Sequence, residues 1–471
     1  MNKEKELVKN TAIITAGRLC TQLVSFFLLP LYTSILSTEE YGIVDLVITY
    51  STFLLPFITL ALEQAIFRFL LDVRDDKDKQ CSYISTAFFT TISILLFAVL
   101  IIGVIYIITS NRLFFYFALV LIAITFSNMS LQVCRGFGDN IGYTLGSTIS
   151  AVFQVLCNVL FLVVFKWAAP GMMLASFVGN MVCGFVCSIR CKTWKYIRIN
   201  KWKASVFKEL TNYSLPLIPN QLSWWALNAS DKVIVQFFIG VAGNGLIAVA
   251  NKFSGVYIQF STVFNISWTE SAAIHYQDKD AEKFFSHTIN TVYKLFLSMC
   301  FGIIVCMPFV FPIMVNLQFK EAYYLIPIFM IASLFNVVVS LYGVIYVAHK
   351  KTVEIAKTAI YAAAINILSH LVLIHFIGIY AAPVSTAIGY GGMAIYRYFH
   401  SRKYMTIKFT NKTILLSIIM FVVSIGSYYS GITAIQAVSF AVILILSICI
   451  NRDILTKSFM IVKGRLFKNR R

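Results

Sequence analysis

Acidic residues, prolines and histidines are scarce in this sequence, and charge as a whole is scarce. The 471 residues include 20 Asp and Glu, nine Pro and six His, and charged residues make up 13% of the chain. Soluble domains carry about 25% charged residues. A protein built mainly from soluble domains is therefore excluded, although the length alone would allow two or three of them.

Motifs for catalysis and metal binding are also missing from the sequence. No Walker-type glycine loop is present, which excludes ATP hydrolysis by a P-loop. Most of the ten cysteines lie in apolar segments, and Cys183, Cys187 and Cys191 have no nearby His or acidic residue to complete a metal site. We therefore predict packing thiols, no metal, no cofactor and no enzymatic activity. The histidines form no motif either: His275, His287, His349, His370, His375 and His400.

Long apolar segments take up nearly the whole chain. About fourteen of them follow one another with short polar breaks, and hydrophobic residues make up 59% of the sequence. About 20 apolar residues cross a bilayer as a helix. The predicted fold is therefore an all-α, polytopic membrane protein with about 14 transmembrane helices. They are expected at residues 8–36, 41–71, 82–109, 112–134, 142–166, 170–189, 209–239, 245–272, 285–316, 322–348, 353–376, 378–399, 411–428 and 432–450.

The basic residues predict the orientation of these helices. With the N-terminus placed in the cytoplasm, the loops on that side carry about thirty Lys and Arg, whereas the opposite loops carry only Arg112, Lys166 and Lys320. Cytoplasmic loops are enriched in Lys and Arg, so both termini are expected inside. The formal net charge of +19 is spread over many short loops, which favours anionic lipid headgroups over nucleic acid as its partner.

The two halves of the chain are weakly similar to each other. A shift of 203 residues places Leu36–Gly42 on Ile239–Gly245, and both stretches are short outer loops that end in glycine. Two like bundles around a central cavity are usual in alternating-access transporters. The alternative is chance similarity between two hydrophobic hairpins. We predict a six-helix lobe with its basic linker at 1–200, a second six-helix lobe at 201–405, and an extra helix pair with a basic tail at 406–471.

Three basic residues lie deep inside predicted helices. Arg18, Lys252 and Lys294 are each about 10–15 Å from the nearest end of their segment, because a helix rises 1.5 Å per residue. A basic side chain that faces lipid at this depth costs about 2.5–3.5 kcal/mol. These residues are therefore expected to line a hydrated cavity for an anionic cargo, unless carboxylates within the bundle neutralise them.

Four carboxylates in the same segments could neutralise these cations. A buried carboxylate also takes up a proton more readily than an exposed one. Asp231, Glu63 and Glu270 are therefore candidates for binding a coupling H⁺ or Na⁺, with ordinary salt bridging as the alternative. Lys232 lies near a helix end, where anchoring at the membrane interface is expected. The four carboxylates are Asp45, Glu63, Asp231 and Glu270.

Helix-bending residues and polar groups cluster at the start of each half. Proline within a membrane helix frees a backbone carbonyl and allows bending. The segment 214–231 is unusually polar, and its Asn228 is a further candidate for contact with cargo. The candidate gating and kink positions are Pro30, Gly42, Pro216, Pro219 and Gly245.

At these residues the chain resembles a known family. Pro30-Leu-Tyr-Thr-Ser-Ile-Leu-Ser-Thr-Glu-Glu-Tyr-Gly-Ile-Val-Asp45 is similar to the first outer loop of the bacterial polysaccharide repeat-unit flippases (Wzx type). Those flippases are part of the multidrug/oligosaccharidyl-lipid/polysaccharide exporter superfamily. Residues 214–231, 245–252 and 268–272 resemble the second-half counterparts, although Gly245-Leu-Ile departs from the Gly-Tyr pattern of this loop.

The resemblance implies a fold, a cargo and a location. It implies twelve core helices in two lobes arranged as a V, and the extra pair at 411–450 resembles the added helices of peptidoglycan-precursor flippases. The implied cargo is an undecaprenyl-pyrophosphate-linked oligosaccharide, which is moved from the cytoplasmic to the outer leaflet of the bacterial inner membrane. The implied pathways are O-antigen, capsule or exopolysaccharide synthesis, with a polymerase and chain-length machinery as partners.

Three other classes of function stay open. A drug or organic-cation exporter on the same scaffold would need an acidic or aromatic cavity, whereas the deep charges here are mainly basic. A membrane glycan polymerase or acyltransferase would need catalytic carboxylates or a His–Asp pair, usually in a large outer loop. A scaffold without transport activity would have no use for deep charges, which are costly in a membrane.

Overall fold

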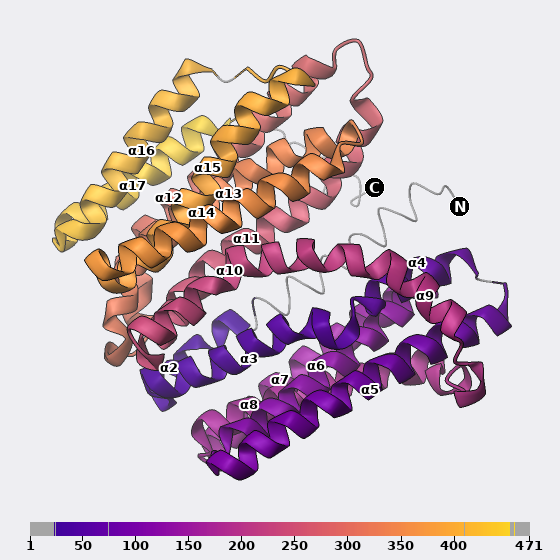
Figure 1. Ribbon diagram of the computed structural model, residues 1–471. Coiled ribbons are helices and arrows are strands. Elements are labelled where there is room, and N and C mark those ends of the chain that lie inside the picture. Colours follow the sequence, from indigo (N-terminus) through magenta and orange to yellow (C-terminus); the bar gives the residue numbers. More distant parts are fainter. Residues whose placement is uncertain (1–22, 24, 74, 409, 453–455, 457–471) are drawn as a thin grey trace, which may run out of the picture. The chain divides into compact units, whose positions relative to one another are not determined.

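Helices joined by short connections make up the protein (Figure 1). The computed structural model describes residue 23 and residues 25–73, 75–408, 410–452 and 456. Within these residues there is no β-strand, and ten helical stretches are long and apolar enough to cross a membrane. One stretch, Thr352–Lys403, contains two successive helices. The chain is thus an all-α, multi-pass membrane protein, as the sequence predicts.

The described chain divides into two compact units. The first comprises the described residues up to Val249 together with His370–Ala382, and the second comprises the described residues of 250–369 and from Pro383 onward. The predicted lobes at 1–200 and 201–405 follow the sequence repeat and stay a prediction. The helices of the first unit are α2 (Leu29–Ile35), α3 (Thr38–Thr59), α4 (Leu62–Asp72), α5 (Lys77–Thr109), α6 (Leu113–Gly136), α7 (Asn140–Val159), α8 (Ala168–Cys191), α9 (Ala204–Ser214) and α10 (Ile218–Phe238).

Two long helices belong partly to each unit. They are α11 (Val241–His275), which begins in the first unit, and α14 (Thr352–Ile377), which ends there. Short helical turns join several of the long helices at Leu160–Val164, Thr193–Lys195, Ile199–Lys201, Leu215–Leu217, Leu317–Phe319, Gly378–Tyr380 and Ser401–Lys403. The remaining helices of the second unit are α12 (Ala281–Met314), α13 (Lys320–Ala348), α15 (Ala381–His400), α16 (Asn411–Ser430) and α17 (Thr433–Ile450).

The sequence Ser-Thr-Glu-Glu determines where α3 begins. Ser37 accepts a hydrogen bond from the backbone of Glu40 (3.1 Å), and the Glu40 carboxylate accepts one from the backbone of Ser37 (2.9 Å). This capping box satisfies two backbone donors that a helix start would otherwise leave open. The predicted outer loop at Leu36–Gly42 is therefore a tight, well-defined helix start.

Two predicted spans are interrupted by short non-α breaks. The span at 41–71 is broken at Leu60 and Ala61, which both adopt left-handed backbone conformations (φ 51° and 53°) between α3 and α4. This conformation costs about 1–2 kcal/mol per residue for an L-amino acid. The span at 209–239 is broken at Leu215–Leu217, where Pro216 lies in a short 3₁₀ turn between α9 and α10.

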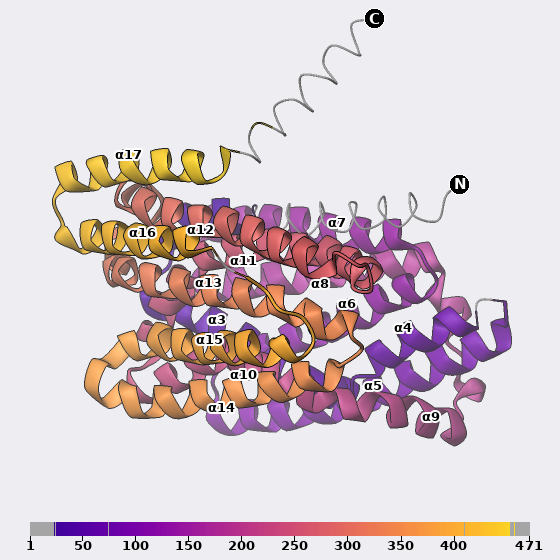
Figure 2. The same cartoon turned by 90° about the horizontal axis from the view of Figure 1, so that it is seen from above.

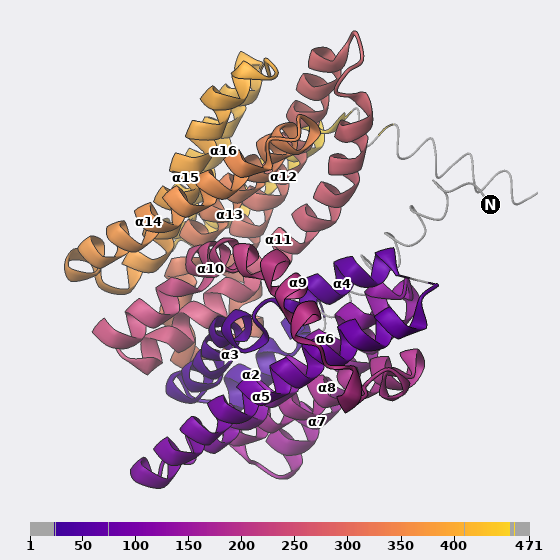
Figure 3. The ribbon, with the colours of Figure 1, turned by 45° about the vertical axis from the view of Figure 1, so that its right-hand side comes forward.

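Helices α4, α5 and α9 pack together at one end of the first unit (Figure 3). Their buried residues form one cluster that includes Ile66, Leu70, Ile84 and Leu210. Beyond this cluster α5 is mostly exposed along its apolar half, as expected for a helix that faces lipid.

The predicted extra pair at 411–450 forms a hairpin of α16 and α17 (Figure 2). Gly431 occupies the turn between them with φ 67°, a conformation that glycine adopts without strain. Both helices pack against α12. Tyr428 also stacks on Tyr323 of α13 and donates a hydrogen bond to its carbonyl oxygen (2.6 Å).

Candidate functional site

The predicted cationic residues lie on different elements. Arg18 lies outside the described residues. Lys252 on α11 and Lys294 on α12 are both in the second unit, and both side chains are half-buried. Asn228 on α10 is in the first unit and donates a hydrogen bond to the carbonyl oxygen of Trp224 (2.7 Å). That these four residues meet around one cargo stays a prediction.

Lys294 is the clearest free cation of the predicted set. It lies about 20 Å from the start of α12, at 1.5 Å per residue. Within the described part of the chain it forms no ion pair. A charge at this depth needs water or an anion beside it. Lys294 is therefore available to bind a negatively charged group.

Lys232 is paired within the protein, contrary to the expectation that it anchors the membrane interface. Its ammonium lies 2.9 Å from Asp45 of α3, and both side chains are about one-fifth exposed. The other oxygen of Asp45 accepts a hydrogen bond from Asn244 of α11 (3.2 Å), whose amide also reaches the Gly42 carbonyl oxygen (3.0 Å). This polar network links α3, α10 and α11, and it neutralises the charge of Lys232.

Gly42 and Gly245 lie at a close crossing of α3 and α11. A side chain on Gly42 would overlap the backbone of Val241, and one on Gly245 would overlap the backbone of Thr38. The 203-residue shift matches Thr38 with Val241 and Gly42 with Gly245, so it exchanges one of these two contacts for the other. The two predicted gating glycines thus face each other across a pseudo-two-fold axis, as residues do at an isologous interface.

Asp231, a predicted ion-coupling residue, is buried beside a histidine. Oδ1 of Asp231 lies 3.4 Å from Nδ1 of His370 on α14, and the two side chains are 6% and 0% exposed. Nε2 of His370 has no hydrogen-bond partner in the described part of the chain. His370 belongs to no catalytic or metal-binding motif, so it was not among the predicted site residues. Its position near the middle of an apolar span, which is rare for an ionisable residue, could have identified it as a candidate.

Glu63, the second ion-coupling candidate, lies directly after the break at Leu60 and Ala61. It is 3% exposed, and its side chain lies within hydrogen-bonding reach of Thr59 and Gln221. The third candidate, Glu270, lies half-buried on α11 in the second unit, and it forms no ion pair with any described residue. Of the three, Glu63 and Asp231 are buried, at 3% and 4% exposed.

The predicted kink prolines lie at helix starts. Pro30 is in the first turn of α2, Pro216 is in the 3₁₀ turn before α10, and Pro219 is in the first turn of α10. Proline suits these positions because the first turn of a helix leaves its backbone N–H groups without helical partners.

Arg397 is a buried cation near the end of the predicted span 378–399, and it is not among the candidate residues. It lies in the last turn of α15 and is 2% exposed. Its guanidinium donates hydrogen bonds to Thr358 of α14 (2.7 Å) and to the Val339 carbonyl oxygen of α13 (2.9 Å). Arg397 therefore fastens three helices of the second unit together and is not available to a cargo.

Comparison with known proteins gives one family and one fold. Residues 7–267, more than half of the chain, match the family model described as "Polysaccharide biosynthesis protein". No curated protein matches the chain.

Solved transporter structures share the fold at low sequence identity. One is lipid II flippase MurJ in an inward closed conformation (TM-score 0.69, 13% identity, 95% of this chain and 100% of that chain). Another is an inward-facing multidrug resistance MATE family transporter of the MOP superfamily (TM-score 0.66, 12% identity, 81% and 94%). An outward-facing structure of such a transporter is also similar (TM-score 0.58, 13% identity, 86% and 96%).

Proposed function

Because the chain belongs to the polysaccharide biosynthesis protein family, we propose that it is a lipid-linked oligosaccharide flippase of the Wzx type. Its cargo is an oligosaccharide repeat unit on undecaprenyl pyrophosphate, which it moves from the cytoplasmic to the outer leaflet of a bacterial inner membrane. Surface polysaccharide synthesis, as O-antigen, capsule or exopolysaccharide, consumes the product. A polymerase and chain-length machinery are the expected protein partners.

The observation that carries this proposal is the deep cation Lys294, which forms no ion pair with any residue that the structure describes. A pyrophosphate carries about two negative charges and needs a positively charged site within the membrane, whereas its polyprenyl tail can stay in lipid. Lysine binds phosphate as a point charge, and arginine binds it with two parallel hydrogen bonds. We assign Lys294, Lys252 and Arg18 to the pyrophosphate and Asn228 to the neighbouring polar groups of the cargo.

The membrane potential supplies part of the energy for this movement. A potential that is negative inside favours outward movement of an anion by about 2.3 kcal/mol per charge per 100 mV. For two charges this is about 4–5 kcal/mol. A coupling ion, H⁺ or Na⁺, resets the empty carrier in this proposal, and buried Asp231 and Glu63 are its candidate sites, with Glu270 as a third.

The burial of the Asp231–His370 pair favours transport over catalysis as the function of the protein. A membrane glycan polymerase or acyltransferase needs its His–Asp pair open to a bulky substrate, whereas these two side chains are at most 6% exposed.

Gene deletion and charge reversal test the proposal. Deletion is expected to make lipid-linked repeat units accumulate on the inner leaflet and to abolish the surface polysaccharide, while drug susceptibility is unchanged. Lys294→Glu and Lys252→Glu are expected to reproduce the deletion at normal protein abundance, because each places an anion where the pyrophosphate would bind.

Lys357→Glu is the matched control. Lys357 is on α14 of the same protein, but it is 56% exposed and already contacts Glu354, so its reversal is expected to leave export intact. Normal surface polysaccharide after deletion, without a second flippase, would overturn the proposed function. Full export by both Lys294→Glu and Lys252→Glu would overturn only the assignment of the site.

A further inference from the structure

The basic linker between α8 and α9 is held firmly against α5. Ser82 of α5 donates a hydrogen bond to the Lys201 carbonyl oxygen (3.0 Å), and Ser85 accepts one from the backbone of Arg198 (2.9 Å). The indole of Trp202 donates to Thr90, two turns further along the same helix (3.4 Å). Because these three hydrogen bonds lie on one face of α5, the linker is held in a fixed position beside that face.

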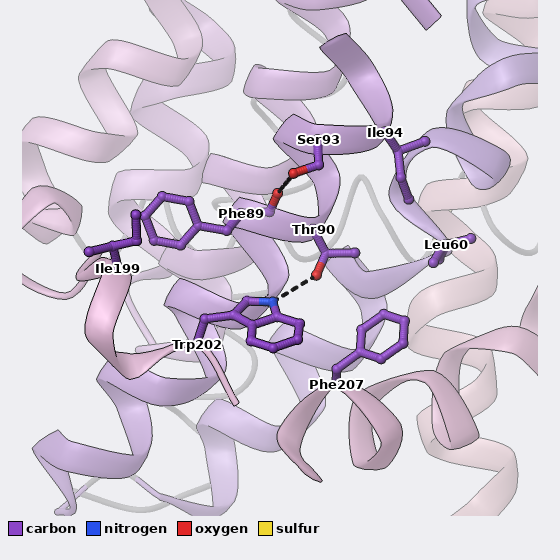
Figure 4. Close-up of a pocket in the computed structure, with 8 residues that line it drawn as sticks. All are labelled: Leu60, Phe89, Thr90, Ser93, Ile94, Ile199, Trp202 and Phe207. Carbon is purple, nitrogen blue, oxygen red and sulfur yellow. Dashed lines mark hydrogen bonds between the residues drawn. The ribbon is translucent and has the colours of Figure 1, made fainter. Parts of the chain in front are cut away.

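An open apolar groove of about 660 Å³ lies between this linker and α5 (Figure 4). In Figure 4, Ile199 and Trp202 approach from the linker, and Phe207 approaches from α9. Phe89 and Ile94 lie on the α5 side, together with Thr90 and Ser93. Ile199 is 80% exposed and Trp202 is 45% exposed, so both side chains present apolar surface outside the protein core.

The groove lies inside the predicted membrane boundary, along the apolar region of α5. The predicted apolar span of α5 begins at Ser82, and the groove residues Phe89 and Ile94 lie about 10 Å and 18 Å further along the helix axis. The backbones of Arg198 and Lys203 are held nearer to that boundary, by hydrogen bonds to Ser85 (2.9 Å) and Thr86 (3.3 Å). The basic linker residues thus lie nearer the headgroup level, and the groove lies at the level of acyl chains.

Positive charge is concentrated at the headgroup end. Residues 190–208 contain seven Lys and Arg and no Asp or Glu. Arg190 pairs with Asp139, and Lys201 pairs with Asp78. The other five form no ion pair with any described residue, and all five are exposed: Lys192, Lys195, Arg198, Lys203 and Lys208. Arg198 and Lys203 directly adjoin the groove residues Ile199 and Trp202 in the chain.

We propose that this groove binds one anionic glycerophospholipid, with an acyl chain against α5 and the phosphate at Arg198 and Lys203. An apolar slot alone would accept any lipid, whereas Arg198 and Lys203, which are exposed and form no ion pair with any described residue, favour a negatively charged headgroup. The site belongs to the first unit and is separate from the proposed cargo residues Lys252 and Lys294. Such a lipid would fasten the linker to the membrane surface on which the cargo is loaded.

Lipid binding to the purified full-length protein tests this site. Native mass spectrometry compares phosphatidylglycerol with phosphatidylcholine of the same two 16-carbon chains. We expect phosphatidylglycerol to bind about tenfold more tightly, and we expect Arg198→Gln/Lys203→Gln to reduce its affinity to that of phosphatidylcholine. Lys279→Gln/Lys283→Gln is the control, because it removes two exposed basic residues from the second unit and should leave phosphatidylglycerol binding unchanged.

Two further measurements test the groove itself. Phosphatidylglycerol with brominated chains should quench tryptophan fluorescence in the wild-type protein, and Trp202→Phe should remove that quenching while lipid still binds. Phosphatidylglycerol with six-carbon chains should bind at least tenfold more weakly, because it cannot fill the groove.

Three results would overturn the proposal. Equal affinity for the two headgroups would show an unselective apolar surface, and equal affinity for short and long chains would show binding of phosphate alone. Unchanged quenching in Trp202→Phe would place the lipid elsewhere. Loss of export with intact lipid binding concerns only the proposed flippase function, so the two proposals fail separately.

Discussion

Among single residues, His370 and Asp231 make the most consequential contact in the first unit. Both are buried, and their nearest atoms are 3.4 Å apart. Lys232, the next residue after Asp231, is already neutralised by Asp45, so it does not fix the charge of Asp231. The contact between Asp231 and His370 joins α10 to α14, and the loss of either side chain would leave the other as a buried polar group without this partner.

Replacement of either member of the pair should impair transport. His370→Asn and Asp231→Asn are each expected to lower export at least tenfold, because each change removes the described partner of a buried polar side chain. Export of labelled lipid-linked oligosaccharide from vesicles measures both effects. His375→Asn is the control, since His375 is exposed on the same helix, and full export by His370→Asn would remove the pair from the transport mechanism.

Single residues also show where sequence reasoning reached its limit. The candidates Asp45, Glu63 and Asp231 were found from the sequence because carboxylates are rare in membrane helices, and all three are at least largely buried. Arg397 was not singled out, because it lies near the end of its predicted span, where basic residues are common. Its burial depends on carbonyl and hydroxyl groups of α13 and α14, and no pattern within its own segment encodes those partners.

At the scale of helices, the crossing of α3 and α11 depends on two glycines. A methyl group on either one would overlap backbone atoms of the other helix, and backbone cannot move aside as a flexible side chain can. The sequence repeat identified both glycines, because each ends a matched outer loop. It did not identify the break at Leu60 and Ala61, where neither glycine nor proline occurs and the conformation is imposed by tertiary packing.

Alanine substitutions measure how tight this crossing is. Gly42→Ala and Gly245→Ala are each expected to lower the free energy of unfolding by about 1–3 kcal/mol, the usual range for overpacking. The double variant should lose less than the sum, because both residues occupy one contact. Gly103→Ala is the control, since a methyl group on this α5 glycine meets nothing within 4 Å. Chemical unfolding in detergent provides the comparison, and equal stability of Gly42→Ala and Gly103→Ala would contradict the tight crossing.

At the scale of the whole molecule, the fold class was predictable and the arrangement of its cations was not. The length of the apolar segments and the spacing of the polar breaks between them predicted an all-α membrane protein, because few backbone structures other than helices can satisfy their hydrogen bonds within a bilayer. The predicted convergence of Arg18, Lys252 and Lys294 depends on distances between segments, and periodicity contains no such distances. The ion pair of Lys232 shows the same limit, because its partner Asp45 lies on another helix.

The orientation of the molecule is directly testable with reporter fusions. Green fluorescent protein attached after residue 280 or after residue 403 is expected to fluoresce, because the loops there carry the basic excess and should be cytoplasmic. Alkaline phosphatase attached after Asn316 is expected to be active, because that loop belongs to the opposite set. The reverse pattern at these three positions would contradict the predicted topology and the direction of the proposed transport.

The glycine crossing also shows where its two matched sides differ. Thr38 matches Val241 and Gly42 matches Gly245, yet Tyr41 matches Asn244, and only the asparagine can bind both Asp45 and the facing carbonyl oxygen. In a pair of identical subunits, every side chain would occur twice at such a crossing. Within one chain the two sides can differ, so one carries a polar anchor where the other carries an aromatic ring.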